Sequence, residues 1–141
     1  MKTQGKMSTF GGPHDTGVAA DEGLALIEPG DLIEWWFRRI FLPAHPPNTS
    51  GLARRLNPEA FYIAMRWATL ESSESSGATF VSRETARRSI FRLSANGKSI
   101  FAQAADFGPA VRTKRVVDMS PGAASALGLT TDDIVEVEMI A

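Results

Sequence analysis

Apolar and polar residues alternate in the C-terminal third of the chain, where the pattern predicts short β-strands. Residues 89–93 and 98–104 flank the pair Asn96-Gly97, and Asn-Gly favours the positive φ angles of a tight hairpin turn. Residues 134–140 interleave apolar side chains with two glutamates, which is typical of a half-exposed strand. We therefore expect a hairpin at 89–104 and a last strand at 134–140.

Between these elements, the sequence predicts a short strand followed by a helix of about two turns. Residues 115–118 fit the strand. Ser120 is a good N-cap, Pro121 a good first helical residue and Gly128 a good stop. Asp118 comes two residues before the N-cap, so we expect its carboxylate to bond amides at the helix start and to have a structural role.

The first half of the chain has weaker signals. Residues 1–23 are rich in Gly, Thr and Asp, and the segment FGGPHDTG within them predicts a shaped loop. The apolar cluster at 32–41 fits a short helix or a buried strand equally well and is expected to be core. FYIAMRW at 61–67 predicts a strand, and it lies between a Pro-rich surface loop at 43–51 and a small, polar one at 71–77.

Size and charge limit the functional classes. The chain has 141 residues, 43% of them hydrophobic, which is enough to form one domain spanning residues 1–141. Lys+Arg 15 against Asp+Glu 16 gives a net charge of −1, which argues against nucleic acid as a partner. The sequence has no cysteine and 2 histidines, so we expect no metal and no cofactor.

The first residues lack the apolar run that follows the basic residues of a signal peptide, so we expect no signal peptide, and no apolar run approaches the roughly 20 residues of a membrane span. We expect a soluble monomer without membrane insertion. The compartment stays open, and action on the cell envelope or outside the cell requires processing or another delivery route.

Many short strands, one short helix and Gly/Pro turns predict an all-β chain with small helices, arranged as a small barrel. The segment ADFGPAVRTKRVVDMSPGAASALGL, followed by the strand IVEVEMI, resembles the C-terminal half of the double-psi β-barrel of rare lipoprotein A, barwin, expansins and related endoglucanases. This resemblance extends from the Asn96-Gly97 turn to the C-terminus. It implies a six-stranded double-psi β-barrel and a cell-wall polysaccharide partner, with peptidoglycan the favoured class.

Asp106 is the main catalytic candidate, because it ends a predicted strand and precedes Gly108-Pro109. In the resembled enzymes, an Asp in this turn is a catalytic or substrate-binding acid; the structural alternative is that it bonds turn amides. Glycoside cleavage normally needs two carboxyl groups. Asp15 and Glu22, both on the N-terminal loop, are the candidate partners by analogy of position.

Five further residues are candidates for substrate binding. A histidine beside Asp15 could orient a substrate, while aromatic rings could stack on sugars and an arginine could bond their polar groups. The same mixture also suits an ordinary β surface. The five are His14, Tyr62, Trp67, Phe107 and Arg112.

Three functions therefore stay open. The first is a glycoside-cleaving enzyme of the lytic transglycosylase or endoglucanase type, and the second is a glycan-binding module without catalysis. The third is a protein-interaction module, such as a protease inhibitor or a component of a phage or secretion particle. A separation within about 10 Å between the carboxylates of Asp106 and either Asp15 or Glu22, across an open groove, favours the enzyme.

Overall fold

The computed structural model describes residues 2–19, 23–32, 35–67 and 81–140. The loop expected at 71–77 and the candidate Glu22 lie outside these ranges. The strands and helices are β1 (Lys2–Thr9), α1 (Trp35–Arg38), α2 (Leu52–Arg55), β2 (Tyr62–Ala64), α3 (Arg83–Arg88), β3 (Ile90–Ala95), β4 (Lys98–Asp106), the 3-10 turn η1 (Val111–Thr113), β5 (Arg115–Met119), α4 (Pro121–Leu127) and β6 (Ile134–Met139).

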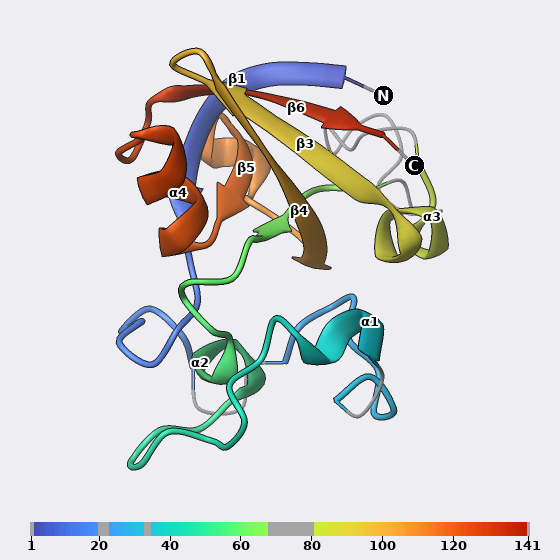
Figure 1. Cartoon of the computed structure of the whole chain (residues 1–141), viewed down its shortest axis with the longest axis vertical. Coiled ribbons are helices and arrows are strands. Elements are labelled where there is room, and N and C mark those ends of the chain that lie inside the picture. Colours follow the sequence, from blue (N-terminus) through green and yellow to red (C-terminus); the bar gives the residue numbers. More distant parts are fainter. Residues whose placement is uncertain (1, 20–22, 33–34, 68–80, 141) are drawn as a thin grey trace.

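The strands close into a barrel in the order β1-β5-β2-β4-β3-β6, with β6 returning to β1 (Figure 1). The pairs β1/β5 and β2/β4 are parallel, whereas the other four neighbouring pairs are antiparallel. Closure leaves no sheet edge without a neighbour. The predicted fold class, all-β with small helices and a six-stranded barrel, is confirmed.

The two elements with the strongest local signals form where the sequence predicts them. The hairpin turn joins β3 to β4 with positive φ angles at Asn96 (54°) and Gly97 (74°). Helix α4 starts after Ser120, whose Oγ accepts a hydrogen bond from the backbone N–H of Ala123 at 3.1 Å. The helix ends at Gly128, which has a φ of 68°.

The N-terminal segment differs from the expectation, because β1 occupies residues that the sequence pattern assigned to a loop-rich stretch. Its sequence, KTQGKMST, has one large apolar residue, Met7, which is fully buried. Hydrogen bonding to β5 and β6 fixes this strand, and such distant partners are not visible in a local pattern. The segment 61–67 contributes only the three residues of β2, all of them buried.

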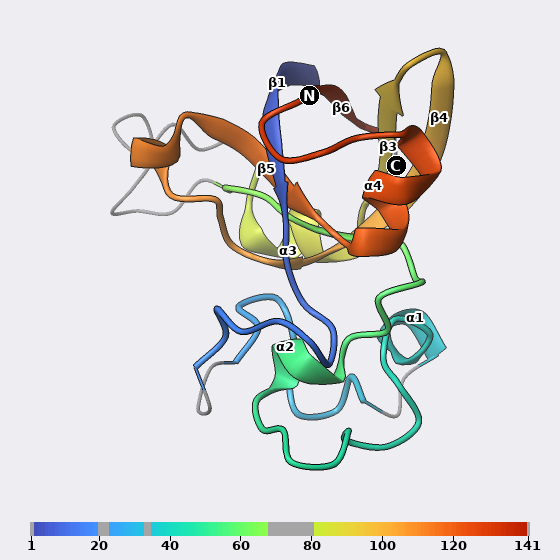
Figure 2. The same ribbon diagram turned by 90° about the vertical axis from the view of Figure 1, so that its left-hand side faces the viewer.

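Two apolar clusters divide the molecule. The first fills the barrel. The second lies among the residues that connect β1 to β2, which we call the connecting lobe (described residues 10–19, 23–32 and 35–61). Figures 1 and 2 both show this lobe on one side of the barrel, below it in each view. The lobe residues of this second cluster are Leu24, Phe37, Ile40, Phe41, Ala53 and Leu56, and they pack with Tyr62 and Ala105 from the barrel strands.

The lobe confirms part of the core expected at 32–41, since Phe37, Ile40 and Phe41 are buried. The Pro-rich loop at 43–51 is mostly exposed, as predicted. Backbone hydrogen bonds join the lobe to the barrel strands, among them Leu26 N–H to the carbonyl of Ala105 at 3.2 Å.

Candidate functional site

Two carboxylate side chains flank β2. Ala64 at its end pairs with Asp106 of β4 on one side and with Asp118 of β5 on the other. Paired residues point to the same face of a sheet, and neighbouring strands are about 4.8 Å apart, so the Cα atoms of the two aspartates lie about 10 Å apart. Val117 and Met119 are fully buried, so strand alternation directs Asp118 away from the barrel core.

The Asp118 carboxyl is the more perturbed of this pair. Burial raises its pKa to about 6; the Arg115 charge opposes this rise, the Asp106 charge adds to it, and the Arg66 charge opposes it. Oδ1 is out of contact with solvent, and within the described part of the chain no hydrogen-bond partner reaches it. Oδ2 faces Gly108, 3.9 Å from the position that a Cβ there would occupy.

This environment differs from the structural role expected for Asp118. No described amide of α4 donates to its carboxylate, because the Ser120 hydroxyl already accepts the first-turn bond from Ala123. The side chain instead lies beside the turn that joins β4 to β5. Asp118 is therefore a candidate acid that sequence reasoning set aside.

Asp106 links that turn to the connecting lobe. Its Oδ1 accepts hydrogen bonds from the backbone N–H groups of Phe107 at 2.8 Å and of Ala25 at 2.9 Å. The first of these is the turn bond that the structural alternative predicts. The second comes from the lobe, so the orientation of this carboxylate depends on how the lobe packs against the barrel.

Arg66 and an aromatic pair surround the same turn. The Arg66 Nη1 donates to the carbonyls of Pro109 at 2.6 Å and of Arg115 at 2.9 Å, and so joins the start of the β4–β5 connection to its end. The rings of Trp67 and Phe107 meet edge to face with centroids 4.6 Å apart. Trp67 is only 5% exposed, whereas Phe107 is 36% exposed, so Phe107 presents the accessible aromatic surface beside Asp106.

Asp15 organises its own loop. Its Oδ2 accepts from the N–H of Gly11 at 2.6 Å, and its Oδ1 accepts from the N–H of Gly17 at 2.9 Å. The neighbouring His14 is exposed and lines a depression of about 280 Å³ together with Thr9 and other residues of this loop. Both oxygens of Asp15 thus hold the loop, and neither bonds to the Asp106 turn.

Tyr62, expected to stack on a sugar, is a core residue with 0% exposure. Its hydroxyl donates to the carbonyl of Phe10 at 2.9 Å. Burial raises the pKa of this hydroxyl far above its usual value, and the negative charge of Asp15 adds to the rise. Stacking needs an accessible ring face, which Tyr62 lacks. Arg112 is exposed on η1, in the connection between β4 and β5.

Two general features of the described residues bear on function. No three acidic, histidine or cysteine side chains among them come together as a metal ion would require. No helix among them is both long and apolar enough to cross a membrane.

Searches of protein-family models and of curated proteins return no match to this chain. Among solved structures, the chain is similar to Streptomyces papain inhibitor (SPI), with a TM-score of 0.51 and 13% identity. The match covers 100% of this chain and 96% of that one. The fold is a double-psi β-barrel. At this low identity the likeness shows the fold alone, which agrees with the two parallel strand pairs of the closed barrel.

Within this double-psi barrel, the sequence predicted one member of the site and missed the other. The turn signal of Gly108-Pro109 identified Asp106. Asp118 was missed, because its position opposite Ala64 depends on the pairing of β2 with β5. Arg66 carried no sequence signal, because its two carbonyl partners lie more than 40 residues away.

Proposed function

We propose that this double-psi barrel binds a cell-wall polysaccharide, with peptidoglycan the favoured class, and cleaves it at the Asp106/Asp118 pair. One observation carries the proposal. The two carboxyl groups flank a single strand, and burial, with a smaller contribution from the Asp106 charge, raises the pKa of Asp118 to about 6. Glycoside cleavage uses a pair of carboxyl groups, one of which donates a proton.

The proposal gives the two carboxyl groups different tasks. Asp118, protonated below a pH of about 6, donates its proton to the departing glycosidic oxygen. Asp106 stabilises positive charge on the sugar ring, or acts as the base that takes the proton from the water or sugar hydroxyl that bonds to the ring carbon as the glycosidic bond breaks. The proton donor is thus Asp118, whereas the sequence predicts Asp106 as the main catalytic residue. Asp15 has no part in catalysis, because loop amides occupy both of its oxygens.

The substrate class rests on the resemblance of the ADFGPAVRTKRVVDMSPGAASALGL segment to rare lipoprotein A and its relatives. The exposed ring of Phe107 supports it, because sugars bind on aromatic faces and this ring lies next to Asp106 in the chain. Trp67 packs edge to face against the Phe107 ring and is itself too buried to bind a sugar.

The test compares the release of soluble fragments from purified peptidoglycan by the wild type and by Asp118→Asn, Asp106→Asn and Glu136→Gln. Glu136 lies on β6, which does not border β2, so Glu136→Gln is the matched control. We expect both aspartate variants to lose release and the control to keep it. Wild-type release should also fall as the pH rises through about 6, because Asp118 then loses its proton. Full release by Asp118→Asn would refute the acid assignment.

A second candidate is a protein-interaction module that inhibits a protease. It is favoured by the description of the similar solved structure as a papain inhibitor. Sedimentation with insoluble cell wall and an assay of papain activity separate the two. Wall binding without inhibition supports the polysaccharide function. Inhibition without wall binding, unaffected by Asp106→Asn and Asp118→Asn, supports the inhibitor.

A further inference from the structure

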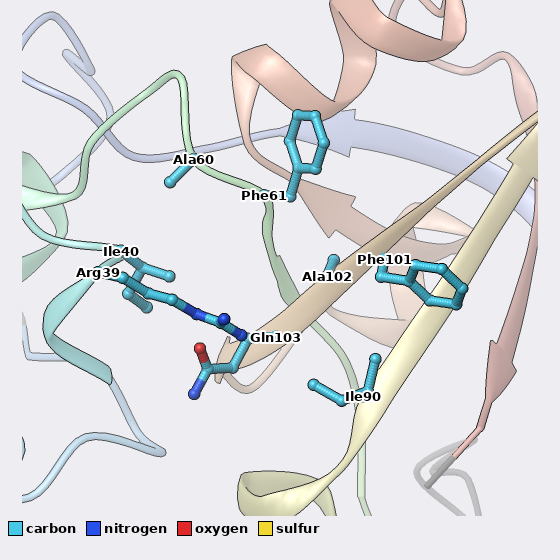
Figure 3. Close-up of a pocket in the computed structure, with 8 residues that line it drawn as sticks. All are labelled: Arg39, Ile40, Ala60, Phe61, Ile90, Phe101, Ala102 and Gln103. Atoms are coloured by element: carbon cyan, nitrogen blue, oxygen red, sulfur yellow. The ribbon is translucent and has the colours of Figure 1, made fainter. Parts of the chain in front are cut away.

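The connecting lobe meets the barrel in two different ways. Over part of the interface, a pocket of about 330 Å³ lies between lobe residues such as Ile40 and the strands β3 and β4 (Figure 3). Residues 24–31 of the lobe, which we call the strap, instead bond directly to the barrel beside Asp106. The pocket leaves part of the interface unfilled, whereas the strap makes close contacts at the candidate site.

The strap is anchored around Ala25. The next residue, Leu26, is fully buried in the core of the barrel, and its N–H donates to the carbonyl of Ala105 at 3.2 Å. The carbonyl of Ala25 accepts a hydrogen bond from Nε of Arg83, on helix α3, at 3.0 Å. This carbonyl and the Leu26 N–H belong to one planar peptide group, so that group is held between β4 and α3.

The N–H of Ala25 reaches the candidate site. It donates to Oδ1 of Asp106 at 2.9 Å. Because the following peptide group is fixed, only rotation about the two backbone bonds at the Ala25 Cα can redirect this N–H. Its direction toward the carboxylate therefore depends on the anchors of the strap, and Arg83 acts on Asp106 through Ala25.

Arg83 is held in turn by the acidic residues of the strap. Its Nη1 lies 3.1 Å from Oε1 of Glu28, whose Oε2 lies 3.7 Å from Nη2 of Arg87. Arg87 also pairs with Asp31, which accepts from the N–H of Glu28 at 2.7 Å. An exposed ion pair contributes little to stability by itself. Here the pairs direct the guanidinium of Arg83 toward the carbonyl of Ala25.

We propose that Arg83 is a positioning residue for Asp106: it holds the strap so that the N–H of Ala25 keeps this carboxylate in one orientation. A reacting group that moves by about 1 Å can lose a large part of its catalytic effect, so a fixed orientation matters for cleavage. The role in cleavage rests on the proposed function, whereas the hold of Arg83 on the carboxylate does not.

The first experiment follows amide hydrogen exchange by NMR in the wild type, in Arg83→Met and in Arg88→Met. Arg88 lies on the same helix and pairs with Glu84, so it is the matched control. Arg83→Met should speed exchange at Ala25 at least about tenfold, because its N–H loses a fixed charged acceptor. Exchange at Asn57, which bonds elsewhere in the lobe, should stay at the wild-type rate, and Arg88→Met should match the wild type at both amides.

A second background tests the connection to Asp106. In Asp106→Ala the N–H of Ala25 has lost its carboxylate acceptor, so adding Arg83→Met should change its exchange by less than about twofold. A merely structural role of Arg83 would instead speed exchange equally in both backgrounds.

Fragment release from peptidoglycan measures the effect on cleavage. Arg83→Met should release fragments about tenfold more slowly than the wild type, while it sediments equally with insoluble wall. Arg83→Lys keeps a donor for the Ala25 carbonyl and should recover part of the rate, and Arg88→Met should keep all of it.

The two measurements can fail separately. If the wild type releases no fragments, the proposed function fails, and the exchange rates still decide the role of Arg83. Three results would overturn the proposal: wild-type exchange at Ala25 in Arg83→Met, an equal acceleration in the Asp106→Ala background, or equal release by an active wild type and Arg83→Met.

Discussion

The barrel and the connecting lobe are built in different ways. Each barrel strand pairs with two neighbours, and the closed sheet surrounds its own apolar core. The lobe instead contains two helices of four residues each, α1 and α2, and a bridge between Phe41 and Leu56. Its core is completed by side chains from barrel strands, Tyr62 and Ala105. The lobe therefore needs the barrel as a packing surface, and the hydrogen bond from Ala25 to Asp106 joins the two at the candidate site.

The largest expected effect separates the two cores with the same substitution. Phe91 in the barrel and Phe37 in the lobe are both buried. Phe91→Ala should lower the free energy of unfolding of the whole chain by about 4 kcal/mol, because it leaves a cavity in the barrel core. Phe37→Ala should act mainly on the lobe. Hydrogen exchange measures this as lost protection at lobe amides such as Asn57, whose N–H bonds to the Ile40 carbonyl.

If Phe37→Ala reduces protection of barrel amides as much as that of lobe amides, the chain unfolds as one unit. The two regions would then differ in architecture but not in stability.

A smaller effect tests the junction. Gly11 has a φ of +83°, and a Cβ there would lie 2.5 Å from the Tyr62 hydroxyl and 2.8 Å from Leu56. Gly11→Ala should therefore disturb the Tyr62–Phe10 hydrogen bond and cost about 3 kcal/mol. Gly23→Ala is the control, because no atom lies within 4 Å of its Cβ position. Thermal denaturation should show a lower midpoint for Gly11→Ala only.

The Asp118 site gives an effect of opposite sign. Its pKa is raised from the usual 3.8 to about 6, so its contribution to stability is full below pH 3.8 and is lost as the pH rises through about 6. Asp118→Asn removes this loss and should stabilise the protein at pH 7 by about 2 kcal/mol.

The measurement for Asp118 is urea unfolding between pH 4 and pH 7. The wild-type free energy should fall over this interval relative to that of Asp118→Asn. In Asp106→Asn the same fall should move to somewhat lower pH, because the rise caused by burial stays while the added rise from the Asp106 charge is gone. A wild-type profile parallel to that of Asp118→Asn would contradict the raised pKa.

The smallest effect concerns a local signal inside the barrel region. Ser120→Ala removes the N-cap acceptor of α4 and should cost about 1 kcal/mol. Ser125→Ala, at an exposed position of the same helix, should be neutral. Helix α2 of the lobe has Gly51 at its N-cap and no side-chain cap, so the lobe lacks an equivalent substitution. Urea unfolding of both variants measures the difference.

Sequence reasoning was accurate where structure depends on near neighbours in the chain. The Asn96-Gly97 turn and the Ser120 to Gly128 helix form as expected, because their hydrogen bonds span three to five residues. It was inaccurate for β1, whose polar sequence contains little alternation. It placed Tyr62 at a sugar-binding surface, although the ring completes the core of the lobe.

The all-β barrel, its hairpin, its capped helix and the turn that contains Asp106 can be predicted from the sequence. Strand pairing places Asp118 opposite the same alanine as Asp106, and packing between the two regions brings residues of the lobe, β3 and β4 around one pocket; neither arrangement is visible in a local pattern. The physical reason is the range of the interactions. Caps and tight turns are encoded within a few residues, whereas strand register and packing between two regions depend on contacts among segments that are dozens of residues apart.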